Sequence, residues 1–123
     1  MGINKILIVD DSPTMLRILV NTLEKAGYPK IIQAENGLIA LDLLAKDADI
    51  SLILSDWNMP EMTGIEFLTK VKSNEKTKSI PFIMVTSRNV KEDILQAIKL
   101  GARDYIVKPF TVDAIKAKLL GLG

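Results

Sequence analysis

The sequence predicts an α/β fold built on a doubly wound, five-stranded parallel sheet. Five short apolar runs, at residues 6–9, 31–32, 52–54, 82–85 and 105–107, alternate with longer segments of helical spacing. The runs are continuous rather than alternating, which is typical of parallel strands that are buried on both faces. Strict alternation of strands and helices implies right-handed crossovers and three layers.

The segments between the runs predict five helices. Ser12 can cap the first helix, Pro13 suits its first position and Gly27 ends it. Gly64 opens the third helix and Gly101 closes the fourth. The apolar residues that mark these helices are Leu16, Leu19, Val20 and Leu23, then Leu38, Leu41 and Leu44, then Ile65, Leu68 and Val71, then Val90, Ile94 and Ile98, and last Val112, Ile115 and Leu119.

Length and composition favour one compact domain. The 123 residues are 48% hydrophobic and 25% charged, and no linker or repeat divides them, so we expect residues 1–123 to form a single domain. Sixteen basic residues face fifteen acidic ones without long blocks of like charge, so we expect no nucleic-acid binding. The apolar runs are too short to insert into a membrane and no targeting segment is visible. We therefore expect a cytoplasmic monomer.

The absence of two residue types restricts the chemistry. The chain has no Cys and no His, which excludes thiolate catalysis, zinc thiolate sites and a Ser-His-Asp triad. Any reaction must then depend on carboxylates, hydroxyls, Lys and Arg. Any bound metal should be a hard ion that prefers oxygen ligands, such as Mg²⁺.

Polar residues follow the predicted strands at their carboxyl ends. Asp10 and Asp11 follow the first strand, Asp56 the third, Thr86 the fourth and Lys108 the fifth. Each has an ordinary explanation alone, as a turn residue, a helix cap or a solvated side chain. Together they indicate a site, because ligands of open parallel sheets bind outside the carboxyl ends of the strands.

This set of groups suits a phosphoryl group. Three crowded carboxylates repel one another unless a cation neutralises them, and Mg²⁺ is the natural candidate for oxygen ligands. Lys108 adds a second positive charge to the same pocket. A metal and an ammonium group around a carboxylate can stabilise phosphoryl transfer, and the carboxylate can itself be the nucleophile.

Four segments resemble the signature segments of response regulator receiver domains. They are residues 8–12 (Ile-Val-Asp-Asp-Ser), 56–60 (Asp-Trp-Asn-Met-Pro) with Gly64, 85–87 (Val-Thr-Ser) and 107–110 (Val-Lys-Pro-Phe). Their order and spacing match across essentially the whole chain, and the second is similar to chemotaxis regulators of the CheY type. The resemblance implies a flavodoxin-like (CheY-like) three-layer sandwich with strand order 2-1-3-4-5. It also implies a signalling switch rather than an enzyme with a turnover substrate.

The resemblance assigns the phosphorylation site residue by residue. Asp56 would accept the phosphoryl group. Asp11 and Asp56 would bind Mg²⁺ through their side chains, Asn58 through its backbone carbonyl and Asp10 through water. Lys108 would pair with the phosphoryl group.

The resemblance also assigns a switch. Thr86 would move to hydrogen-bond a phosphoryl oxygen, and Tyr105 would turn inward as Thr86 vacates its space. Asn58 and Arg88 would tune the rate at which the phosphoryl group is lost to water. The Lys108–Pro109 peptide bond would be cis.

The same resemblance implies the partners. The chain lacks the nucleotide-binding pattern Gly-x-x-x-x-Gly-Lys, so the phosphoryl group must come from outside. We expect a histidine kinase or a small donor such as acetyl phosphate, a flagellar motor switch protein or another protein target, and a phosphatase. The target would bind the face formed by the fourth helix, fifth strand and fifth helix, with candidate contacts at Lys91, Ile94, Lys99, Ile106 and Lys116.

Two other functions stay open. One is a single-domain phosphorelay shuttle that passes the phosphoryl group to another His, which the sequence does not separate from motor control. The other is a Mg²⁺-dependent phosphohydrolase with an Asp nucleophile. Such enzymes usually place Asp-x-Asp after the first strand, whereas Asp10 and Asp11 are adjacent here.

Overall fold

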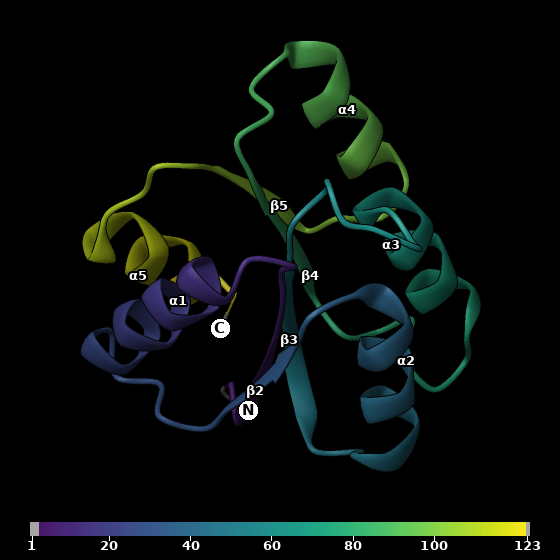
Figure 1. Ribbon diagram of the computed structural model, residues 1–123, viewed down its shortest axis with the longest axis horizontal. Helices are drawn as coiled ribbons and strands as arrows, with labels where there is room; N and C mark the ends of the chain where they lie inside the picture. The colour runs from purple at the N-terminus through teal and green to yellow at the C-terminus, as the bar shows by residue number, and fades with distance from the viewer. Residues whose placement is uncertain (1–2, 123) are drawn as a thin grey trace.

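A computed structural model describes residues 3–122, which form a five-stranded parallel sheet with helices on both faces (Figure 1). The strands are β1 (Lys5–Val9), β2 (Ile31–Ala34), β3 (Ile50–Ser55), β4 (Phe82–Thr86) and β5 (Asp104–Val107). The helices are α1 (Pro13–Lys25), α2 (Gly37–Lys46), α3 (Gly64–Ser73), α4 (Lys91–Lys99) and α5 (Val112–Leu120). The strand order β2-β1-β3-β4-β5 confirms the predicted fold class and topology. Residues 1, 2 and 123 of the expected domain lie outside the described residues.

Two apolar cores lie on opposite faces of the sheet. Successive residues of a strand point to opposite faces, so β1 contributes Ile6 and Ile8 to one core and Leu7 and Val9 to the other. The first core packs against α1 and α5, on the left of Figure 1, and the second against α2, α3 and α4. This division is the three-layer arrangement that the continuous apolar runs predict. Within the described part of the chain, no helix is long and apolar enough to cross a membrane.

The helix boundaries follow local chemistry. The Ser12 hydroxyl accepts a hydrogen bond from the Met15 amide at 3.2 Å, which confirms the predicted cap of α1. Thr63 and Glu66 form a reciprocal capping box at the start of α3. Gly27 and Gly101, the predicted ends of α1 and α4, have φ of 100° and 119°, a region that favours glycine.

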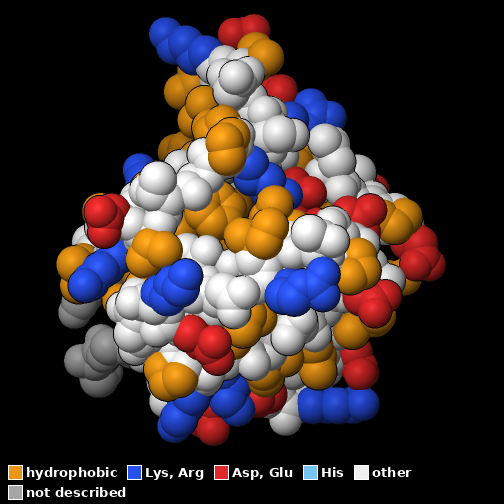
Figure 2. All heavy atoms as spheres, turned by 60° about the vertical axis from the view of Figure 1, so that its left-hand side comes forward, with side chains coloured by type: hydrophobic (Ala, Val, Ile, Leu, Met, Phe, Trp, Pro, Cys, Tyr) orange, Lys and Arg blue, Asp and Glu red, His pale blue; other side chains and the backbone are white. Residues whose placement is uncertain are grey.

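Some of the apolar residues that mark the predicted helices are exposed. Leu38 is 50% exposed, whereas α2 buries Ala40 and the expected Leu44. Ile98 is also exposed, and the one residue that α4 buries is Ala97. Helical spacing shows which residues share a face, but the neighbouring elements decide how much of that face is covered. Hydrophobic side chains are accordingly visible along the upper part of the molecule in Figure 2, where α4 lies. The exposed large hydrophobic residues in and directly beside α4 include Val90, Leu95, Ile98 and Leu100.

The start of α3 lies directly against the end of β3. The Gly64 amide donates to the Trp57 carbonyl at 2.7 Å. A Cβ atom at Gly64 would overlap the Asp56 carbonyl oxygen and lie 2.7 Å from the Trp57 Cα. Only glycine therefore permits this close approach, which holds the backbone that follows β3 in place.

We expect Gly64→Ala to lower the free energy of unfolding by about 1–3 kcal/mol, because an added methyl group must displace backbone. The matched control is Gly37→Ala, which also changes the first residue of a helix. Its Cβ would meet the flexible Met62 side chain, with Sδ at 2.8 Å, so its cost should be smaller. Urea unfolding of both variants measures the difference, and equal effects would contradict this role of Gly64.

Candidate functional site

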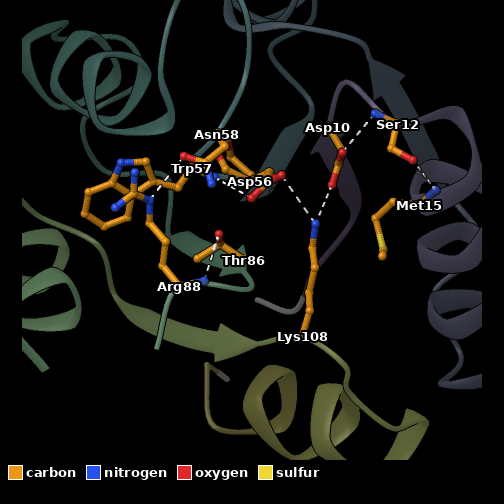
Figure 3. Close-up of polar contacts among 10 residues, drawn as sticks. Asp10, Ser12, Met15, Asp56, Trp57, Asn58, Thr86, Arg88 and Lys108 are labelled. Carbon is orange, nitrogen blue, oxygen red and sulfur yellow. Dashed lines mark hydrogen bonds and ion pairs between the residues drawn. The ribbon is translucent and has the colours of Figure 1, made fainter. Parts of the chain in front are cut away.

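The polar residues predicted to converge do so at the carboxyl ends of four strands. Asp10, Asp56 and Lys108 directly follow β1, β3 and β5, and Thr86 is the last residue of β4. Figure 3 shows them turned toward one another, with Lys108 reaching up between the two carboxylates. The fold thus brings together groups that are far apart in the sequence.

Lys108 connects two of the carboxylates. Its Nζ atom lies 2.8 Å from Asp10 Oδ2 and 3.4 Å from Asp56 Oδ2. Its backbone amide donates to the Thr86 carbonyl at 2.9 Å, which extends the β4–β5 pairing to the pocket. The predicted cis Lys108–Pro109 bond is confirmed. The ammonium group is therefore placed between the strands and not in free solvent.

Asp10 is a buried carboxylate with two donors. Its Oδ1 accepts from the Ser12 amide at 2.9 Å and its Oδ2 accepts from Lys108. Only 2% of the residue is exposed. Burial raises the pKa of Asp10, and the neighbouring Asp56 carboxylate adds to this, while Lys108 and the Ser12 amide act in the opposite direction. Lys108 thus stabilises the charged form of Asp10, but it does not fully offset the rise in pKa that burial causes.

Asp56 presents one oxygen to the backbone and one to the pocket. Its Oδ1 accepts from the Trp57 amide at 2.7 Å, and its Oδ2 faces Lys108. Its own amide donates to the Val9 carbonyl at 2.9 Å, which ties it to β1. These contacts fix the rotamer of a carboxylate that could act as a nucleophile.

Three carboxylates can hold a metal ion at this edge. One oxygen from each of Asp10, Asp11 and Asp56 lies within 4.8 Å of the others. Asp11 is exposed, which leaves room for water molecules around a bound ion. An all-oxygen set with access to water suits Mg²⁺, which keeps several waters in its shell. The residues present therefore fit the predicted metal.

The two predicted switch residues contact the same segment. The Arg88 amide donates to Thr86 Oγ1 at 3.4 Å, and the Tyr105 hydroxyl donates to the Arg88 carbonyl at 2.9 Å. Thr86 is fully buried and Tyr105 is 8% exposed, so the tyrosine ring lies inside the protein here. Burial raises the pKa of Tyr105, with a further contribution from Asp93. The backbone of Arg88 thus links the hydroxyl group to the ring.

The Arg88 side chain covers the rim of the pocket. Its Nε donates to Asn58 Oδ1 at 3.1 Å, its Nη1 lies 3.2 Å from Asp93 Oδ2, and its Cζ lies 4.7 Å from the centre of the Trp57 ring. The side-chain oxygen of Asn58 is therefore bonded to Arg88. The group of Asn58 that is predicted to bind metal is its backbone carbonyl. Sequence reasoning missed Asp93, because an acidic residue in the first turn of a helix is common for other reasons.

The predicted output face needs one correction. Ile106 is 5% exposed, because it packs in the core shared with α1 and α5, so it is not a surface contact. Lys91, Lys99 and Lys116 are exposed as expected. Leu95 and Ile98 of α4 are also exposed and line an open depression with Lys99.

Comparisons with known proteins show the family and the fold of the chain. Residues 6–120 match the sequence family described as the response regulator receiver domain. A chemotaxis protein CheY homologue of Campylobacter jejuni is 47% identical over 122 residues, covering 97% of this chain and 94% of that protein. CheY1 of Helicobacter pylori is 46% identical over 115 residues, covering 94% of this chain and 93% of that protein. The crystal structure of CheY4 from Vibrio cholerae is similar with a TM-score of 0.89 at 33% identity, covering 99% of this chain and 100% of that one.

We expect Asp10→Asn to stabilise the metal-free protein near neutral pH. The pKa of Asp10 is raised in the folded state, so its charged form disfavours folding at pH values above that pKa. The stability advantage of Asp10→Asn should shrink as the pH falls through the folded pKa toward the ordinary Asp value of about 3.9. Thermal unfolding of both proteins in EDTA across this pH range measures that advantage. A variant whose advantage grows in acid would contradict the assignment.

Proposed function

The chain belongs to the response regulator receiver domain family, and we propose that it is a phosphorylation-activated switch whose phosphoacceptor is Asp56. The observation that carries this proposal is the placement of the Asp56 carboxylate, with one oxygen held by the Trp57 amide and the other facing Lys108. Asp10 and Asp11 complete an acidic pocket beside it.

The phosphoryl group passes directly to Asp56. A carboxylate oxygen attacks the phosphorus of a phosphohistidine or of acetyl phosphate, and a P–O bond forms as the bond to the leaving group breaks. The leaving group keeps the electron pair, and Asp56 becomes an acyl phosphate. Lys108 stabilises the negative charge on the phosphoryl oxygens. In a separate hydrolysis step, water attacks the phosphorus and the P–O bond to Asp56 breaks, which releases inorganic phosphate and restores the carboxylate.

The metal of this reaction is Mg²⁺. Asp11 and Asp56 would bind it directly through carboxylate oxygens, and Asn58 through its backbone carbonyl. Asp10 would bind it through a water molecule. The bound ion supplies positive charge to the phosphoryl oxygens. The carboxylates would orient the ion, and the exposed position of Asp11 would leave room for water in its shell.

The signal leaves the site through Thr86 and Tyr105. Within residues 3–122, the hydrogen bond of Thr86 Oγ1 is a long one, 3.4 Å from the Arg88 amide, so the hydroxyl can turn to a phosphoryl oxygen at small cost. The Tyr105 hydroxyl bonds to the carbonyl of the same Arg88, so a shift of this segment alters both residues. Phosphorylation would bias two states of the face formed by α4, β5 and α5. Asn58 and Arg88, which bond to each other at the rim, would tune the access of water.

The partners follow from the family and the relatives. The phosphoryl donor is a histidine kinase, and the downstream partner is a protein. Because the relatives carry chemotaxis names, we infer that the target is a flagellar motor switch protein, that a phosphatase also acts on the chain, and that it works in the cytoplasm as a monomer. Transfer of the phosphoryl group to a histidine phosphotransfer protein, without binding to the motor protein, would favour a relay instead.

Incubation with acetyl phosphate and Mg²⁺ tests the phosphoacceptor. We expect a phosphoryl adduct in the intact mass of the wild-type protein, and no adduct in Asp56→Asn, because an amide oxygen is a poor nucleophile. The matched control is Asp42→Asn, which removes an exposed carboxylate on α2 and should be labelled normally. Labelling of Asp56→Asn to the same extent as the wild type would reject Asp56 as the acceptor.

A further inference from the structure

One side chain joins the rim of the pocket to α4. The Arg88 guanidinium bonds to Asn58 Oδ1 through Nε and to Asp93 Oδ2 through Nη1, and it covers the Trp57 ring. Figure 3 shows it directed along Trp57 and away from Asp56. The position of this cation is therefore set by groups on two elements, the loop after β3 and the first turn of α4.

Asp93 is well placed to control that position. The α4 helix buries only Ala97, and its first turn has no hydrogen bond from the side chain of its cap, Val90, in the described chain. In α1, α2, α3 and α5 the cap side chain makes such a bond. The Asp93 carboxylate is likewise free of a capping role, and the partner it has among residues 3–122 is Arg88. This ion pair is thus a polar connection between α4 and the pocket.

Phosphorylation would change the charge that Arg88 meets. The carboxylate of Asp56 carries one negative charge, whereas a phosphoryl group carries about two. A pocket balanced by Lys108 and a divalent cation therefore becomes more negative by about one charge. Arg88 would then lie between two anions, the phosphoryl group on one side and Asp93 on the other.

We propose that Asp93 is a positioning residue for Arg88, which it holds on α4 in competition with the phosphoryl group on Asp56. This inference rests on the proposed function. Phosphorylation draws the guanidinium from Asp93 toward the phosphoryl oxygens, and α4 loses its polar connection to the rim. When Asp93 is replaced, Arg88 has no ion pair to break before the phosphoryl mimic binds, so the site binds the mimic more tightly.

Titration with beryllium fluoride in Mg²⁺, followed by Trp57 fluorescence, tests the competition in a double-mutant cycle. We expect Asp93→Asn to tighten binding by about 2- to 5-fold, the range for loss of a partly exposed ion pair. The same change in an Arg88→Ala background should have no effect. The matched control is Glu92→Gln, which removes the same charge from the adjacent residue. Glu92 is exposed and forms no ion pair within residues 3–122, so its binding should equal that of the wild type.

A second readout needs no ligand. Asp93→Asn should change the emission of Trp57, because the cation over the ring loses one of its anchors, and it should speed amide exchange at residues 91–94. Glu92→Gln should do neither.

Equal tightening in the presence and absence of Arg88, or identical behaviour of Asp93→Asn and Glu92→Gln, overturns the inference and leaves the proposed function intact. Failure of the wild-type protein to bind beryllium fluoride overturns both.

Discussion

The contact of one lysine with two buried carboxylates is the interaction on which the site depends. Asp10 and Asp56 both face the Lys108 ammonium group, at 2.8 and 3.4 Å, in a place with little access to water. Without this cation the carboxylates would repel each other at the ends of adjacent strands. One ammonium group is still too little for three carboxylates, because burial keeps the pKa of Asp10 raised despite Lys108. The pocket is therefore short of positive charge, which is the physical reason to expect a divalent cation there.

The fold supplies the geometry that this electrostatic arrangement needs. A parallel sheet places the carboxyl ends of β1, β3, β4 and β5 at one edge, so residues from distant segments meet without long loops. Past β3, Gly64 allows α3 to lie against the backbone of Asp56 and Trp57. Past β4, the segment around Arg88 contacts both Thr86 and Tyr105. Asp56, the proposed acceptor, is thus tied by hydrogen bonds to the backbone of β1 and of the loop after β3.

The sequence predicted most of the fold and most of the pocket, for identifiable reasons. Continuous apolar runs and the residues at their ends are local features, and the structure confirms the strands and the convergence of Asp10, Asp56, Thr86 and Lys108. The strand order came from the family resemblance, since spacing alone does not specify which strands pair. The exposure of Leu38 and Ile98 and the burial of Ile106 depend on how much of each element its neighbours cover.

Two contacts at the rim depend on side-chain conformation and so had no signal in the sequence. Arg88 and Asp93 are five residues apart and form an ion pair, while the same Arg88 guanidinium lies over the Trp57 ring and bonds to Asn58. The same ring makes the pocket directly observable. Trp57 fluorescence on addition of Mg²⁺ and then beryllium fluoride, with Asp56→Asn alongside, tests whether this pocket is a metal-dependent phosphorylation site. We expect a saturable change with Mg²⁺ and a second change that requires Asp56. No response to either ligand, together with no phosphate incorporation, would contradict the proposed switch.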